Sequence, residues 1–156
     1  MGLEIERKFL IKNDSWRKEA DNGTLLRQGY LNSTAERTVR VRINGDEAYL
    51  TIKGKNENLT RKEFEYEIPA DEAESLLELC EKPIIEKTRF LIKKNNHTWE
   101  IDIFGGENKG LQVAEIELNS EEEKFQKPTC LGDEVSHDSR YYNSSLISNP
   151  YSKWSD

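Results

Sequence analysis

The sequence predicts an α+β fold in which an eight-stranded antiparallel β-barrel encloses a tunnel and helices pack on its outside. Three observations lead to this prediction. Eight segments alternate polar and apolar residues with the period of two that strands require. Most of them follow one another after short turns, which favours antiparallel pairing, and eight strands are enough to close a barrel. The polar positions of these segments are almost all charged, which is unusual for a strand face that only meets water.

The strands are recognised by their alternation and by their β-branched and aromatic content. Asn44-Gly45-Asp46 is a hairpin signal between two of them, and Gly105-Gly106 marks a further turn. The connection from Gly54 to Thr60 is polar, as expected of a loop. We expect strands at 3–11, 27–31, 38–43, 47–53, 61–68, 86–93, 97–104 and 112–118.

Helices are expected between these strands. The segment after Pro69 contains Asp71, which suits an N-cap position. It also carries an apolar stripe with helical spacing, formed by Ala73, Leu76, Leu77 and Cys80. Further helices are expected after Asn13-Asp14, from Ser120 with Glu121–Glu123 in its first turn, and over 139–147.

Charged residues repeat two positions apart in the expected strands, so that each pair lies on one face. The pairs are Glu4 and Glu6, Arg40 and Arg42, Glu63 and Glu65, Lys87 and Arg89, and Glu115 and Glu117. The simpler interpretation is a sheet face in water. However, like charges this close repel one another unless an opposite charge lies between them, and the apolar face needs the cover that the amphipathic helices supply. The charged face is therefore expected to line the inside of the barrel.

Buried charges cost several kcal/mol each unless they are paired or bound to ions. Hard oxygen ligands without a convergent set of His or Cys indicate Mg²⁺ or Mn²⁺ rather than zinc. Several Arg and Lys side chains indicate phosphate groups. Magnesium together with phosphates suggests a nucleotide or a polyphosphate. His97 and His137 are expected to be structural or solvated, and no Ser-His-Asp or Cys-His arrangement supports covalent catalysis.

Length and composition limit the alternatives. The 156 residues suffice for one domain, expected to span 1–156. The net charge of −7 argues against a general nucleic-acid surface. Because no apolar leader or run of membrane-spanning length is present, we expect a cytoplasmic protein without a membrane partner. Cys80 and Cys130 are too few and too far apart for a disulfide framework or a zinc site.

Glu4-Ile5-Glu6-Arg7-Lys8 resembles the E-x-E-x-K signature of the CYTH superfamily, the triphosphate tunnel metalloenzymes. The resemblance continues in order along nearly the whole chain. Its parts are Gln28–Leu31, Arg40-x-Arg42, Lys53, Arg61–Pro69, Lys87-x-Arg89, Asp102, Glu115-x-Glu117 and Leu131–Leu146. The family fold is an eight-stranded antiparallel barrel with external helices, in agreement with the expectation from the charged face.

The resemblance also implies roles for individual residues. The catalytic set is Glu4, Glu6 and Lys8. The residues implied to grip the triphosphate are Lys8, Arg40, Arg42, Lys53, Lys87 and Arg89. The residues implied to hold divalent metal ions, expected to be two per site, are Glu4, Glu6, Glu63, Glu65, Asp102, Glu115 and Glu117. Tyr30 is expected to line the tunnel and the segment around Arg140–Leu146 to cap one mouth, whereas Glu67 and Arg61 are expected to be solvated.

The resemblance favours a metal-dependent triphosphate hydrolase, most simply an inorganic triphosphatase that converts tripolyphosphate to pyrophosphate and phosphate. Two other chemistries on the same scaffold stay open: a class IV-type adenylyl cyclase and a thiamine triphosphatase. A non-enzymatic binder of polyphosphate or nucleotide is a further alternative. The expected partner is a small-molecule triphosphate, and a homodimer is possible as in related proteins.

Overall fold

The computed structural model of the protein describes residues 2–154. These residues form nine strands and six short helices. The strands are β1 (Gly2–Ile11), β2 (Thr24–Asn32), β3 (Arg37–Asn44), β4 (Glu47–Gly54), β5 (Thr60–Ile68), β6 (Ile85–Lys94), β7 (His97–Phe104), β8 (Gln112–Glu117) and β9 (Leu131–Glu134). The helices are the α-helices α1 (Ala70–Leu79) and α2 (Ser145–Ser148) and the 3-10 helices η1 (Ser15–Glu19), η2 (Gly106–Asn108), η3 (Ser139–Tyr141) and η4 (Tyr151–Lys153).

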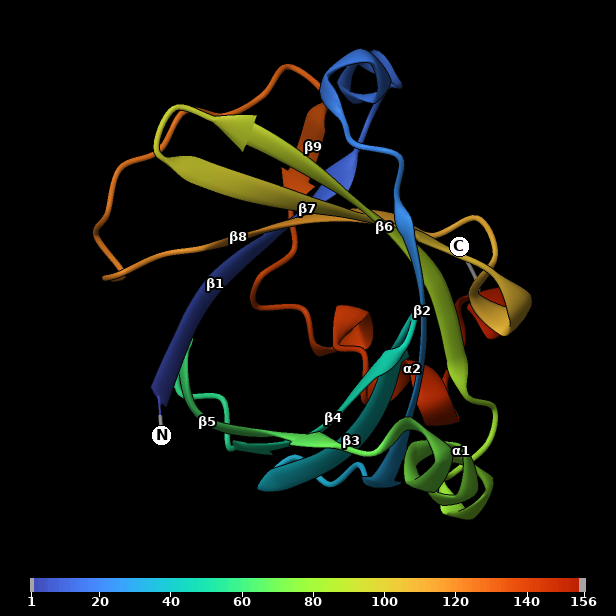
Figure 1. Cartoon of the computed structure of the whole chain (residues 1–156). Helices are drawn as coiled ribbons and strands as arrows, with labels where there is room; N and C mark the ends of the chain where they lie inside the picture. Colours follow the sequence, from blue (N-terminus) through green and yellow to red (C-terminus); the bar gives the residue numbers. More distant parts are fainter. Residues whose placement is uncertain (1, 155–156) are drawn as a thin grey trace.

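Eight of the strands close into an antiparallel barrel in the order β5-β4-β3-β2-β6-β7-β8-β1 (Figure 1). The barrel closes through β1, which pairs with two different strands along its length. Its first part, Gly2–Ile5, pairs with β5, whereas Glu6–Leu10 pairs with β8. The expected eight-stranded barrel is confirmed. β9 was not expected; it is a short ninth strand that pairs with the end of β1 outside the closed ring.

Two apolar cores cover the outside of the barrel. One packs η1 and the segment before β9 against β1, β7 and β8, around Phe9, Trp16, Trp99 and Ile116. In the other, α1 lies across β3 and β4 and buries Leu77 against Val41 (Figure 1). Because the apolar side chains of these strands point outward, the alternate charged positions must point into the barrel.

A third apolar core lies at one end of the barrel. Leu146 and Ile147 of α2 are buried there against residues of β2, β6, β7 and β8, among them Ile85 and Phe104. Figure 1 shows this C-terminal segment lying across the barrel end. The interior is therefore a tunnel that α2 and its core close on one side.

The helix predictions need three corrections. No helix forms at Ser120; a turn forms there instead, closed by a hydrogen bond from Glu123 N to Ser120 O. The expected helix over 139–147 is two short helices interrupted at 142–144. α1 begins at Ala70 with Pro69 at its N-cap, so Asp71 lies in the first turn rather than at the cap. Its carboxylate still suits the positive end of the helix dipole.

The expected strand bounds are largely confirmed, and β2 begins at Thr24, three residues earlier than position 27. η1 confirms a helix after Asn13-Asp14, in 3-10 form. Over residues 2–154, the search for an apolar helix of bilayer-crossing length finds none.

Candidate active site

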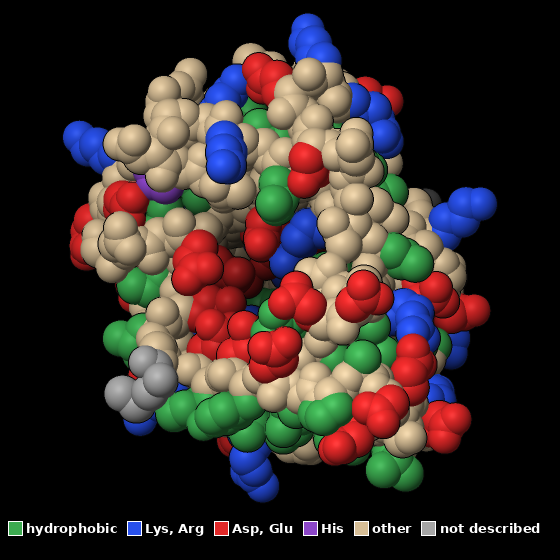
Figure 2. All heavy atoms as spheres, viewed as in Figure 1, with side chains coloured by type: hydrophobic (Ala, Val, Ile, Leu, Met, Phe, Trp, Pro, Cys, Tyr) green, Lys and Arg blue, Asp and Glu red, His purple; other side chains and the backbone are tan. Residues whose placement is uncertain are grey.

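The barrel interior is a cavity of about 270 Å³, at the small end of the range for ligand pockets. Figure 2 shows it as a hollow around which acidic side chains gather, with basic side chains beside them. Every residue of the predicted site lines this cavity except Asp102. The lining members of that set are Glu4, Glu6, Lys8, Arg40, Arg42, Lys53, Glu63, Glu65, Lys87, Arg89, Glu115 and Glu117.

Strand pairing places opposite charges side by side. In the β1–β8 ladder Lys8 lies opposite Glu115, and in the β6–β7 ladder Arg89 lies opposite Asp102. At these two positions an opposite charge lies on the neighbouring strand, whereas Glu6 lies opposite Glu117 and acids there face one another. The repulsion expected along β6 is therefore relieved by register, and that between the acids of β1 and β8 is not.

Asp102 lies behind the cavity wall and organises two cations. Lys87 Nζ lies 2.8 Å from Asp102 Oδ2, and neither side chain is exposed to solvent. Arg89 donates to both carboxylate oxygens, from Nε at 2.8 Å and from a terminal nitrogen at 2.9 Å. Burial alone would raise the pKa of Asp102, but the charges of Lys87 and Arg89 outweigh it and hold the pKa far below its usual value. Because Asp102 is fully buried and does not line the cavity, its position does not support its predicted role as a metal ligand.

The buried cations lack full compensation. Burial lowers the pKa of Lys87 to about 7, against the opposing effect of Asp102. Burial, with Arg40 and Arg89 nearby, lowers the pKa of Arg42 to about 9. Arg42 Nε donates to Gln28 Oε1 at 2.8 Å, and no carboxylate of the described chain lies within ion-pair distance of it. An anion in the cavity would stabilise these charged forms.

Two lysines join the cationic and acidic parts of the wall. Lys53 Nζ lies 2.9 Å from both oxygens of Glu4 and 3.7 Å from Glu63. Lys8 Nζ donates to the backbone oxygen of Tyr141 at 2.8 Å and lies 3.8 Å from Glu115. The carboxylates outweigh the burial of Lys8, so its pKa is raised.

The carboxylates near β1 and β8 repel one another. Burial raises the pKa of Glu6 well above its usual value, and Glu115 and Glu4 raise it further. Burial also raises the pKa of Glu117, with Glu4 and Glu63 adding to the effect. This wall therefore has more negative charge than the neighbouring cations compensate.

This donor set fits a divalent cation. All of the clustered groups are carboxylates, the hard oxygen ligands that Mg²⁺ and Mn²⁺ prefer. A cation would relieve the repulsion that raises the pKa of Glu6 and Glu117. Within residues 2–154, no three Asp, Glu, His or Cys side chains are close enough to hold an ion by themselves. The cavity carboxylates would therefore hold an ion together with oxygen atoms of a bound molecule.

The C-terminal segment closes the inner end of the cavity, as expected of the segment around Arg140–Leu146. Residues 142–144, between η3 and α2, line the cavity. Asn143 Oδ1 accepts from Lys87 Nζ at 2.9 Å and from Gln28 Nε2 at 3.4 Å. The cations at this end therefore contact neutral acceptors of the segment, and the opposite, acidic end faces solvent.

Sequence reasoning missed several lining residues. Glu100 lies two residues before Asp102 and on the same face of β7, so the i, i+2 spacing of charged residues could have identified it. Its carboxylate lies 3.3 Å from Arg89. Asn143 was not singled out, although it lies in the segment around Arg140–Leu146 that was expected to cap one mouth. Asn56 lies outside regular strands, and no pattern in the sequence indicates that it reaches the cavity. Tyr30 lines the cavity, as expected.

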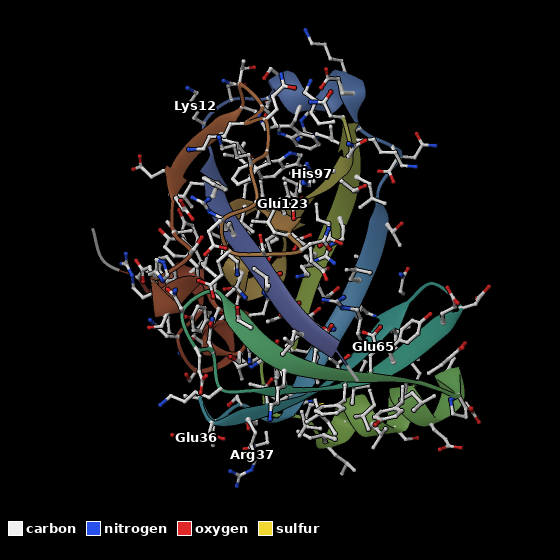
Figure 3. All side chains as sticks on the ribbon, turned by 90° about the vertical axis from the view of Figure 1, so that its left-hand side faces the viewer. Lys12, Glu36, Arg37, Glu65, His97 and Glu123 are labelled. Carbon is white, nitrogen blue, oxygen red and sulfur yellow. The ribbon has the colours of Figure 1, made fainter. Side chains whose placement is uncertain are left out.

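The histidines lie away from this site. His97 Nε2 is 2.6 Å from Glu123 on the outside of the barrel, where the two side chains point toward each other (Figure 3). Neither His97 nor His137 lines the cavity. Both positions agree with the structural or solvated roles expected for them.

A closed barrel with facing rows of cations and carboxylates defines a class of protein that binds polyanions and metal ions inside a tunnel. The CYTH domain family model matches residues 2–149. The chain belongs to the CYTH domain family.

Its relatives include enzymes of known name. An inorganic triphosphatase of Acetivibrio thermocellus is 48% identical over 157 residues, which is 100% of both chains. An inorganic triphosphatase of Nitrosomonas europaea is 35% identical and covers 92% of this chain and 95% of its own. The crystal structure of the inorganic triphosphatase NE1496 has a TM-score of 0.66 at 34% identity, over 94% of this chain and 95% of that one.

Proposed function

We propose that the protein is a divalent-metal-dependent inorganic triphosphatase that hydrolyses tripolyphosphate to pyrophosphate and phosphate. The observation that carries this proposal is a small tunnel, closed at one end, whose cations are incompletely neutralised and whose carboxylates repel one another. Relatives of full length that are named inorganic triphosphatases support it.

The cations of the wall bind the substrate. Lys8, Arg40, Arg42, Lys53, Lys87 and Arg89 surround the cavity and neutralise the non-bridging oxygens of the phosphate chain. Asp102 acts as a positioning residue, because it holds Lys87 and Arg89 in place from behind the wall. Such fixed charges need no rearrangement when negative charge redistributes in the transition state.

The carboxylates hold the metal and orient water. Glu4, Glu6, Glu63, Glu65, Glu115 and Glu117 line the cavity and are the proposed ligands of Mg²⁺ or Mn²⁺, with two ions per site. A bound divalent ion would supply charge neutralisation at the phosphate oxygens and lower the pKa of a coordinated water. Glu4 and Glu6 orient the attacking water in line with the leaving pyrophosphate, the geometry that phosphoryl transfer requires.

The cavity favours an inorganic substrate over a nucleotide or thiamine triphosphate. Its lining is charged or polar apart from Leu59 and two tyrosines, Tyr30 and Tyr142. A base or thiazolium ring would need an apolar or aromatic pocket beside the tunnel. An assay with tripolyphosphate, ATP and thiamine triphosphate, following phosphate and cyclic AMP, separates these activities. Cyclic AMP as main product would overturn the proposal, and ligand binding without phosphate release would indicate the non-enzymatic binder.

The residues are tested by substitution. Glu4→Ala and Lys8→Ala should each lower turnover by about 10²–10³ or more, while thermal melting shows a folded protein. Glu67→Ala and Lys62→Ala are matched controls, because both residues are exposed and outside the cavity lining. Full activity of either site variant would refute the assignment.

A single domain over 1–156, a homodimer, the absence of a nucleic-acid partner and a cytoplasmic location stay predictions. Sedimentation of the purified protein would test the oligomeric state.

A further inference from the structure

Polar atoms without partners gather on one wall of the tunnel. Over residues 2–154, five buried side-chain nitrogen or oxygen atoms have no hydrogen-bond partner. Three of them, Arg40 Nε, Asn56 Oδ1 and Arg61 Nε, belong to residues that line the cavity. Buried polar groups are nearly always paired, because an unpaired one costs free energy. Their concentration in one cavity indicates a polar ligand there.

Asn56 and Arg61 are neighbours across the β4–β5 connection. Glu57 and Thr60 form an isolated antiparallel bridge, with backbone hydrogen bonds of 2.8 and 3.1 Å in the two directions. Asn56 precedes Glu57 and Arg61 follows Thr60, so the two residues occupy the next position along the hairpin. Asn56 Nδ2 donates to the hydroxyl of Tyr142 at 3.2 Å, which leaves its oxygen without a donor.

This hairpin is held in place from outside. Asn58 Nδ2 and Thr60 Oγ1 donate to the two carboxylate oxygens of Glu121 at 2.8 and 2.9 Å. Because the hairpin is anchored by these bonds, its conformation is fixed before a ligand arrives, which reduces the entropy lost on binding.

Within the described part of the chain Arg61 has no carboxylate partner, because the acid opposite it is bound elsewhere. It lies opposite Glu4 in the β1–β5 ladder. Both Glu4 oxygens, however, are taken by Lys53 Nζ at 2.9 Å. No carboxylate of the described chain forms an ion pair with Arg61, although the residue is only partly exposed and its Nε is buried. This differs from the solvated role expected from its place near the strand end.

We propose that Arg61 is a further substrate-binding residue, which donates hydrogen bonds to a phosphate group of the polyphosphate beside Asn56. The inference rests on the proposed function and extends its set of cations to the β4–β5 hairpin. A planar guanidinium suits phosphate oxygens because it presents parallel N–H donors. The oxygen of Asn56 accepts from a water or a protonated oxygen of the same bound group.

The test compares Arg61→Ala, Arg61→Lys and the control Lys62→Ala. Lys62 is exposed on the opposite face of β5, so its removal changes the net charge equally. Calorimetric titration with tripolyphosphate in EDTA measures affinity without turnover, and phosphate release with Mg²⁺ measures KM and kcat. We expect Arg61→Ala to weaken binding and raise KM by about tenfold or more. Arg61→Lys should recover part of the loss, and Lys62→Ala should resemble the wild type.

The outcomes separate this inference from the proposed function. Equal affinity and KM of Arg61→Ala and wild type, with both folded by thermal melting, would overturn the inference alone. Binding that depends on Arg61 without phosphate release by the wild type would overturn the proposed function and support the inference. A wild type that binds neither tripolyphosphate nor pyrophosphate would overturn both.

Discussion

Asp102 and Lys87 form an ion pair inside the barrel wall in which neither side chain reaches solvent, with Lys87 Nζ 2.8 Å from Asp102 Oδ2. A buried pair of this kind contributes little net stability by itself, because both ions lose their hydration. Its effect is to hold a lysine at the tunnel surface. Arg89, bound to the same carboxylate, is held in the same way.

Asp102→Asn should destabilise the protein by about 3–5 kcal/mol, because removing one partner leaves an uncompensated buried charge. The double variant Asp102→Asn, Lys87→Met should recover part of this loss, since it removes both charges of the pair and leaves Arg89 with Glu100 and Glu115, but turnover should stay low. Urea denaturation and phosphate release measure the two effects. Mn²⁺ affinity should be unchanged in Asp102→Asn; a large loss would restore Asp102 to the metal ligands.

The stability of the ligand-free protein should depend on the protonation of Lys87. Its pKa is about 7 in the fold, below the usual 10.5. Below pH 7 Lys87 is protonated in both the folded and the unfolded state, so the folded protein bears the full cost of burying its charge. Between the two pKa values, about 7 and 10.5, the unfolded chain binds more protons than the folded protein. The free energy of unfolding therefore rises with pH, by at most about 1.4 kcal/mol per pH unit. Urea denaturation of wild type and Lys87→Met between about pH 6 and 10 should show a steeper rise in the wild type, because the rise from Arg42, whose pKa is about 9, is common to both proteins. Parallel profiles would contradict the prediction.

Removal of divalent ions should abolish phosphate release, and addition of Mg²⁺ or Mn²⁺ should restore it. Glu6→Gln should raise the Mn²⁺ concentration for half-maximal activity by at least about tenfold, because Glu6 belongs to the crowded carboxylates of the cavity. Titration of Mn²⁺ followed by electron paramagnetic resonance measures binding directly. Glu67→Gln, outside the lining, is the control, and an equal shift in both variants would count against a specific site.

Gly29 has no room for a side chain. A Cβ at this position would lie 2.8 Å from Cys80 Cβ and 3.0 Å from its Sγ, where the end of α1 meets β2. Gly29→Ala should therefore destabilise the protein by about 1–3 kcal/mol, as measured by denaturant unfolding. Gly105→Ala is the control, because its Cβ would meet nothing closer than Glu86 O at 3.9 Å. Equal stability of the two variants would show that α1 shifts without cost.

The alternation of charged and apolar residues was sufficient to predict the barrel and most of its lining. Residues such as Glu4, Glu6 and Lys8 share one strand face by geometry alone, and this holds whatever the strand pairs with. The apolar residues between them require a covered outer face, and η1 and α1 provide that cover over residues such as Ile116 and Val41. Local spacing could not predict β9, because its residues are mostly polar and it pairs only with the end of β1.

The sequence by itself determined which side chains of the strands face the tunnel, since the period of a strand is a local property of the chain. Only the tertiary structure decided what each of them does there. Side-chain contacts between neighbouring strands gave Asp102 two cations, Lys87 and Arg89. Arg61 lies opposite Glu4 but has no carboxylate partner among residues 2–154, because Lys53 contacts both Glu4 oxygens. The segment at 142–144 closes one end by contacts between residues far apart in the chain. Such pairings depend on three-dimensional distance, which no spacing along the chain records.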